Sequence, residues 1–163
     1  MAVFFTGSEL LGVAVGIEKN GAAFYQALAD KSGNKDVKAI YDYLVSEEKK
    51  HQNTFQGMLD TVGEYKPPED YPGEYKLYLQ SLIDSSVFLD ITDAQQKAVK
   101  TSSEMDALKT GIQAEKDSIL FYTEMQNLVR ESDRKVVHDI INEEKSHLRQ
   151  LHELEEVIKK QKG

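Results

Sequence analysis

The chain of 163 residues contains no cysteine. This absence excludes disulfide bonds, cysteine-ligated zinc, a catalytic thiol and an iron–sulfur centre built from the chain's own side chains. Proline is also scarce, with three residues, while 40% of the residues are apolar and 29% are charged. A chain of this length can bury a sizeable core. We therefore predict a single helical domain over residues 1–163.

Excess positive charge and long apolar runs are absent as well. Lys and Arg total 20 against 28 Asp and Glu, so the formal net charge is −8, whereas a nucleic-acid-binding surface needs clustered Lys and Arg. The longest apolar run extends only from Leu10 to Ile17, far short of the roughly 20 residues of a membrane span. The first residues lack the basic segment of a signal peptide. We expect a cytoplasmic protein that binds neither nucleic acid nor membrane.

Apolar residues recur at helical spacing in four long segments, which form two pairs. The first pair covers about residues 6–62, begins at a Thr6 or Ser8 cap and turns at the sequence KSGN. The second pair covers about residues 103–161. Between them, about residues 63–102 open with the breaker-rich stretch GEYKPPEDYPGEY and then allow two short helices, EYKLYLQSLI and DAQQKAVK. We predict an all-α protein in which a long crossover joins two helical hairpins.

The two halves of the chain also resemble each other. GIEKNGAAFY at 16–25 aligns with QAEKDSILFY at 113–122, and SEEKKH at 46–51 aligns with NEEKSH at 142–147. The offset between the halves is 97 in the first match (115 − 18) and 96 in the second (144 − 48). The match is therefore collinear across two helices. We infer two hairpins related by a pseudo-twofold axis.

Acidic and imidazole side chains interrupt the apolar stripes of all four long segments. The residues concerned are Glu18, Glu48, His51, Glu115, Glu144 and His147. Glu18, for example, follows Ala14 by four positions and precedes Tyr25 by seven, so it lies on the apolar face. Each histidine follows a glutamate by three positions and shares its face. Four unpaired carboxylates would be costly to bury, so a compensating group is required.

Their depth in the bundle indicates what that group is. The first hairpin turns at Gly33, midway between Glu18 and Glu48, and the second turns midway between Glu115 and Glu144. Residues equidistant from the turn of an antiparallel hairpin lie level with each other, so each hairpin places its ligands in mid-bundle. Four Glu and two His suit iron or manganese, with zinc as an alternative. Two divalent cations would neutralise four carboxylates, and we predict a two-metal site.

One glutamate on each of two helices and Glu-x-x-His on each of the other two is the ligand pattern of ferritin-like di-iron carboxylate bundles. Within that group the sequence resembles the rubrerythrins over nearly its whole length. The resemblance implies a ferritin-like antiparallel four-helix bundle, with the long crossover between the second and third helices, and two iron ions per chain. It also implies roles for the six residues: Glu18 and Glu115 as terminal carboxylates, Glu48 and Glu144 as bridges, and His51 and His147 on one metal each.

The chain also departs from its relatives at particular positions. It lacks the cysteines of the rubredoxin module that typical rubrerythrins carry. Ser118 stands where rubrerythrins have an additional glutamate, three residues after Glu115, so the metal movement linked to peroxide reduction lacks one of its ligands. Lys49 stands beside Glu48, where bacterioferritins have a haem-binding methionine. A haem-bearing storage cage is therefore disfavoured.

Four further side chains bear on the site. Tyr25 and Tyr122 each follow a predicted ligand by seven residues. They either hydrogen-bond to the ligand carboxylates or pack in the core. Glu47 and Glu143, which precede the glutamates of the two Glu-x-x-His motifs, are expected in solvent or against the outer side of the ligands.

The resemblance favours an oxidoreductase that reduces hydrogen peroxide, or dioxygen more slowly. An external protein such as a rubredoxin would supply the electrons, and a homodimer is the expected assembly. One alternative is a ferroxidase or iron-handling protein. Another is a metal-stabilised helical module that binds a partner without turnover.

Overall fold

The structure of the chain is a computed structural model that describes residues 5–67 and 73–163. These residues form six helices: α1 (Gly7–Lys31), α2 (Lys35–Val62), α3 (Gly73–Asp84), α4 (Ile91–Lys100), α5 (Glu104–Met125) and α6 (Glu131–Lys162). All regular secondary structure in the described ranges is helical. The all-α prediction is confirmed.

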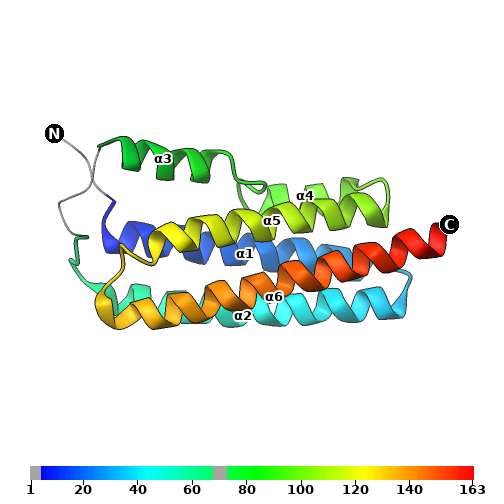
Figure 1. Ribbon diagram of the computed structural model, residues 1–163, viewed down its shortest axis with the longest axis horizontal. Helices are drawn as coiled ribbons and strands as arrows, with labels where there is room; N and C mark the ends of the chain where they lie inside the picture. The colour runs from blue at the N-terminus through cyan, green and yellow to red at the C-terminus, as the bar shows by residue number, and fades with distance from the viewer. Residues whose placement is uncertain (1–4, 68–72) are drawn as a thin grey trace.

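The four long helices form an antiparallel bundle (Figure 1). α1 packs along α2, α5 packs along α6, and the two hairpins meet through α1 with α5 and α2 with α6. The helices α3 and α4 lie on one side of the bundle, where α3 contacts α5 and α4 contacts α1. They carry the chain from the end of α2 back to the start of α5. The predicted crossover between the second and third long helices is therefore confirmed.

Local sequence accounts for where the long helices start and stop. The Thr6 hydroxyl accepts a hydrogen bond from the backbone N–H of Glu9, and the Glu9 carboxylate accepts one from the N–H of Thr6, which satisfies two otherwise unpaired donors. Ser103 caps α5 by accepting a hydrogen bond from the N–H of Asp106. At the end of α2, Gly63 adopts a φ of 58°, which glycine reaches without steric cost.

The buried apolar side chains form two clusters. One includes Leu11, Phe55, Met125 and Ile140, and the other includes Phe24, Leu44, Leu108 and Leu151. Burying each such side chain contributes about 1.5–3 kcal/mol. The clusters occupy opposite ends of the bundle and leave a layer between them for the predicted ligands. Of the helices described, none combines the length and apolar composition needed to cross a bilayer.

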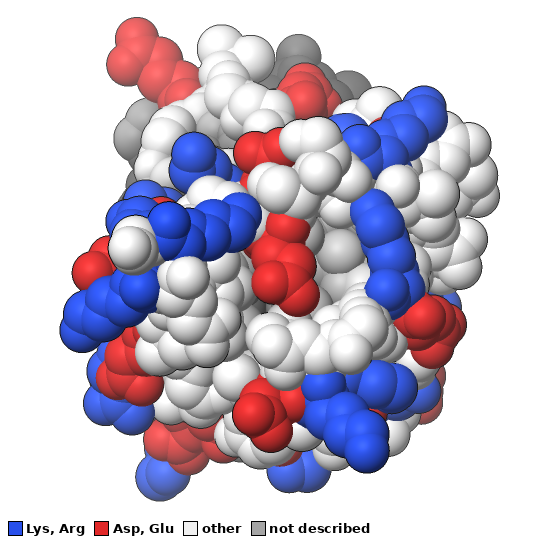
Figure 2. Space-filling model, turned by 90° about the vertical axis from the view of Figure 1, so that its right-hand side faces the viewer, with Lys and Arg blue, Asp and Glu red and all other residues white. Residues whose placement is uncertain are grey.

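The outer surface is charged and mixed in sign. Lys and Arg side chains are interspersed with Asp and Glu around the end of the bundle shown in Figure 2. Several charges pair along a single helix, as Lys38 does with Asp42 on α2 and Lys159 with Glu155 on α6. Such exposed pairs contribute little to stability individually. The predicted metal ligands, by contrast, are buried inside the bundle.

Candidate metal centre

All six predicted ligands lie in one buried layer in the middle of the bundle. Their exposed fractions are 0% for Glu18, 4% for Glu48, 2% for His51, 2% for Glu115, 1% for Glu144 and 1% for His147. α1 and α5 provide one glutamate each, and α2 and α6 provide a glutamate and a histidine each. The structure thus brings together the residues that the sequence placed at one depth. Their role as ligands remains a prediction.

The layer contains two groups of potential ligands that share Glu144. One group is Glu48, Glu115, Glu144 and His147, and the other is Glu18, His51 and Glu144; in each, the ligand atoms lie within 4.8 Å of one another. His51 Nδ1 is 2.6 Å from Oε1 of Glu144, and His147 Nδ1 is 3.4 Å from Oε2 of Glu144. Each oxygen of Glu144 therefore faces a different imidazole. A bridging carboxylate requires this arrangement.

Glu48 also lies between the two groups. Its Oε1 is 3.8 Å from His147 Nδ1 in one group, and its carboxyl group lies close enough to Glu18 in the other for each residue to shift the pKa of the other. The approach is possible because residue 21 is glycine: a Cβ added to Gly21 would lie 2.6 Å from Oε2 of Glu48. Sequence reasoning missed Gly21. Its position three residues after Glu18, which matches Ser118 in the second half, was the available signal.

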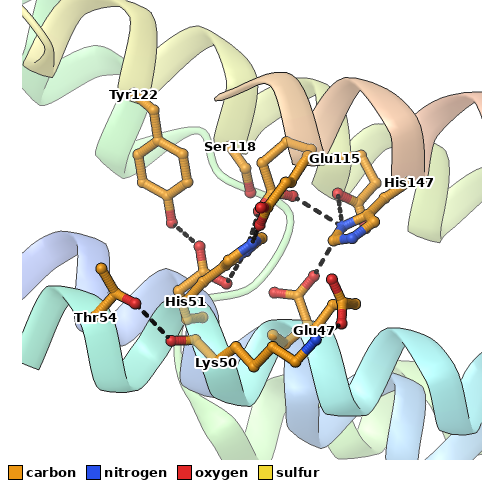
Figure 3. Close-up of polar contacts among 12 residues, drawn as sticks. Glu47, Lys50, His51, Thr54, Glu115, Ser118, Tyr122 and His147 are labelled. Atoms are coloured by element: carbon orange, nitrogen blue, oxygen red, sulfur yellow. Dashed lines mark hydrogen bonds and ion pairs between the residues drawn. The ribbon is translucent and has the colours of Figure 1, made fainter. Parts of the chain in front are cut away.

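The two tyrosines connect the hairpins through the glutamates. The Tyr25 hydroxyl donates to Oε1 of Glu115 at 2.5 Å, and the Tyr122 hydroxyl donates to Oε1 of Glu18. Each tyrosine thus binds the glutamate of the other hairpin, as the Tyr122 contact in Figure 3 illustrates. Burial and the neighbouring glutamates raise the pKa of both hydroxyls well above the usual value. Both alternatives for these residues therefore apply, because the two tyrosines hydrogen-bond to predicted ligands and also pack in the apolar clusters.

Ser118 is buried on α5 but bonds elsewhere. Its hydroxyl donates to the backbone oxygen of Ala114 at 3.1 Å, within its own helix. Among the described residues it makes no hydrogen bond to the six predicted ligands. Ser118 therefore adjoins the layer without orienting a carboxylate in it.

Unpaired polar atoms are concentrated in the layer. In the described part of the chain, buried side-chain polar atoms without a hydrogen-bond partner belong to Glu18, His51, Glu115, Glu144 and His147, with the Tyr41 hydroxyl as the one exception. Each such atom costs about 1–3 kcal/mol when left unpaired. Carboxylate oxygens and imidazole nitrogens that converge without partners fit divalent cations. The donor set therefore suits a two-metal centre.

Three of the carboxyl groups hold protons more tightly than usual. Burial, reinforced by the charge of neighbouring glutamates, raises the pKa of Glu18 and Glu48 well above the ordinary value. The same two causes raise the pKa of Glu115 to about 8. Without bound cations, protons thus limit the negative charge of the layer. Cation binding would displace these protons.

Glu144 and the two histidines, His51 and His147, form a charged triad. Burial opposes ionisation of Glu144, but its close contacts with the imidazoles of His147 and His51 outweigh it and lower the pKa of Glu144. Burial likewise disfavours the imidazolium forms, yet contacts with the glutamates raise the pKa of His51 to about 9 and that of His147 to about 10. At neutral pH, Glu144 is therefore a carboxylate flanked by two protonated imidazoles.

The outer nitrogen of His51 has a carboxylate partner. His51 Nε2 lies 2.5 Å from Oε2 of Glu143, whose side chain is 53% exposed. A carboxylate on the outer nitrogen fixes the orientation of a metal-binding imidazole and raises its basicity. Glu143 therefore supports His51 and links the buried layer to the surface.

The other half of the chain lacks this contact. The position equivalent to Glu143 is Glu47, but its carboxylate is bound by the ammonium group of Lys50 (Figure 3). Nε2 of His147 has no hydrogen-bond partner among the described residues. The equivalent of Lys50 in the second half is Ser146, which carries no charge. The pseudo-twofold symmetry of the inner ligands thus breaks down on their outer side.

The rubrerythrin family model matches residues 9–155, a range that contains all six predicted ligands. A crystal structure from Thermotoga maritima, provisionally assigned as a ferritin-like diiron-carboxylate protein, is similar to the chain with a TM-score of 0.68 and 27% sequence identity over 94% of this chain and 96% of that chain. No protein with a curated description matches the sequence. The structural likeness confirms the ferritin-like architecture.

Proposed function

The chain belongs to the rubrerythrin family, and from this premise we propose that it is a di-iron oxidoreductase that reduces hydrogen peroxide, or dioxygen more slowly. The observation that supports the proposal best is the pair of buried ligand groups that share Glu144. An external protein would supply the electrons, because the chain has no cysteine with which to hold an iron–sulfur centre of its own.

Each group has the ligands for one iron ion. Glu18 and His51 would hold one, Glu115 and His147 the other, and Glu48 and Glu144 would lie between them. Iron held there in the ferrous state would provide the two electrons that cleavage of the O–O bond in peroxide consumes. Carboxylates together with imidazoles suit iron, and the apolar clusters at both ends of the layer keep bulk water away.

Hydrogen bonds from the protein hold these ligands in place. Tyr25 and Tyr122 each donate to the glutamate of the opposite hairpin, so the terminal carboxylates are oriented before a cation arrives. On the outer side, the half-exposed Glu143 lies against His51 Nε2 and would hold the imidazole with its other nitrogen toward the metal.

The choice of oxidant tests the proposal. Iron-loaded, reduced protein is mixed anaerobically with hydrogen peroxide or with dioxygen in a stopped-flow instrument, and the ferric absorbance is followed. We expect faster oxidation by peroxide, with a modest preference because Ser118 replaces the additional glutamate of other rubrerythrins. Ser118→Glu should widen the preference, whereas Ser118→Gln, of the same size but uncharged, should not. Faster oxidation by dioxygen with accumulation of iron mineral in a large shell would instead support the ferroxidase alternative.

The outer nitrogen of His51 has a carboxylate partner, whereas that of His147 has none among the described residues. We therefore expect the two metal positions to differ in affinity. Glu143→Gln removes the carboxylate that orients His51 and should lower the affinity of one of the two metal positions by about 10–100-fold. Competition between the protein and a chelator, followed by metal titration, resolves the two positions.

Glu47→Gln is the matched control because Glu47 contacts Lys50 and not a histidine. It should leave both affinities nearly unchanged. Lys50→Ser should release Glu47 toward His147 and make the two positions more alike. Equal effects of Glu143→Gln and Glu47→Gln would contradict the assignment.

A further inference from the structure

A cavity of about 390 Å³ lies beside the buried layer of predicted metal ligands, called the metal layer below. α1 and α5 form its walls, and residues 82–89 of the crossover, from the end of α3 to the approach to α4, form its roof. At its inner end the cavity reaches Glu48 and Glu115, one predicted ligand from each hairpin. A molecule in this cavity would therefore lie directly against the metal layer.

The cavity is too large for the oxidant alone. Hydrogen peroxide and dioxygen have two heavy atoms each, and a protein cavity of about 150 Å³ already accommodates benzene. A volume of about 390 Å³ falls in the range of small-molecule pockets, roughly 300–1,000 Å³. By the same scale it holds up to roughly fifteen heavy atoms. The volume thus indicates an organic molecule.

The lining indicates the chemistry of that molecule. The walls are mainly apolar, with side chains such as Val13, Ile17, Leu82 and Phe121. Asn20 on α1 also lines the cavity, and its amide makes no hydrogen bond to the described part of the chain. Its counterpart on α5, Asp117, is already engaged: its carboxylate accepts from the N–H of Val87 at 3.0 Å and from Gln113 at 2.9 Å. Asn20 is therefore a polar group of the cavity wall, outside the predicted ligands, that is free to meet a bound molecule.

The roof is held by specific contacts. Besides the bond from Val87 to Asp117, the backbone oxygen of Val87 accepts a hydrogen bond from the ammonium group of Lys97. The ring of Phe88 packs against that of Phe24, with centroids 4.7 Å apart. These contacts hold the crossover to both α1 and α5 above the cavity.

We propose that this cavity binds an apolar organic molecule of up to roughly fifteen heavy atoms, with a single polar end that meets Asn20. The molecule fills the approach to Glu48 and Glu115 between α1 and α5. The inference rests on the shape and chemistry of the cavity and is independent of the proposed peroxide reaction.

A substitution at Gly16 tests the proposal. Gly16 lines the cavity, and a Cβ added there meets no atom within 4 Å, so Gly16→Leu places a side chain in the cavity without a backbone clash. 1-Octanol is titrated into the full chain, loaded with zinc to avoid redox reactions, and binding is measured by calorimetry. Gly16→Leu should weaken binding about tenfold or more, because ligand and side chain compete for the same volume.

Two further variants sharpen the test. Gly57 on α2 is exposed, and a Cβ there also meets no atom within 4 Å, so Gly57→Leu should bind 1-octanol like the wild type. Asn20→Ala should weaken binding of 1-octanol but not of toluene, which has no polar end. Metal content is determined for every variant to establish that the layer is intact.

Two results would overturn the proposal: absence of 1-octanol binding to the wild type, or equal binding by the wild type and Gly16→Leu. If the wild type does not bind 1-octanol and Gly16→Leu changes the oligomeric state measured by light scattering, the cavity faces a second copy of the chain. None of these measurements depends on oxidation, so failure of the peroxide reaction would be recognised separately.

Discussion

Glu144→Ala should abolish high-affinity binding at both metal positions. Each oxygen of Glu144 faces a different histidine, at 2.6 Å from His51 and 3.4 Å from His147, so one substitution removes a ligand from both groups. Glu48→Ala should also lower the metal content sharply, since Glu48 contacts both groups. Elemental analysis after anaerobic iron loading should find two ions per chain in the wild type and a large loss in either variant.

The control for this experiment is Glu153→Ala. Glu153 lies on the same helix as Glu144, but its side chain is 68% exposed and pairs with Arg149 on the surface. The Glu153→Ala variant should retain the full metal content. Full occupancy in both Glu144→Ala and Glu48→Ala would show that the two glutamates do not bridge.

The stability of the metal-free protein should fall as pH rises from about 5 to 9. The folded-state pKa values of His51, His147 and Glu115, about 9, 10 and 8, lie above their unfolded values of 6.5, 6.5 and 4.5. Between the two values the folded state binds more protons, so the stability from these groups is complete below the unfolded pKa and is lost as pH rises through the folded pKa. Glu144, whose pKa is lowered, acts oppositely, but only below about its unfolded value.

The stabilisation that bound metal provides should change in the opposite direction and increase with pH. Cations displace the same protons, so metal affinity increases with pH. Saturation at about a thousand times the dissociation constant adds about 4 kcal/mol per site, which corresponds to an increase in Tm of about 10 °C for a chain of this size. The gap between the melting temperatures of the loaded and metal-free forms should therefore widen between pH 5 and pH 9.

Thermal unfolding followed by circular dichroism, with and without zinc, measures both trends. His152→Gln is the control, because the His152 side chain is 63% exposed and should not alter the pH dependence. A metal-free protein that melts at the same temperature as the loaded form, with no dependence on pH, would mean that the six side chains face water instead of one another.

The sequence by itself was sufficient for the helices and for the composition of the layer. The spacing of apolar residues determines which helix face is buried, and the caps at Thr6 and Ser103 determine where two of the helices begin. Distance from a hairpin turn determines depth, so Glu18 and Glu48 were predictable as neighbours in mid-bundle. These properties depend on local geometry that repeats with every helical turn, and for this reason they can be derived without knowledge of the packing.

Only the tertiary structure decided which side chain meets which. The crossed bonds from Tyr25 to Glu115 and from Tyr122 to Glu18 depend on how the two hairpins are rotated against each other. The apolar spacing within one helix does not determine that rotation. The pairing of Glu143 with His51 likewise depends on rotamers selected by neighbours on another helix. The cavity beneath the crossover exists only because residues 82–89 are held across α1 and α5, a contact between segments whose positions no local pattern specifies.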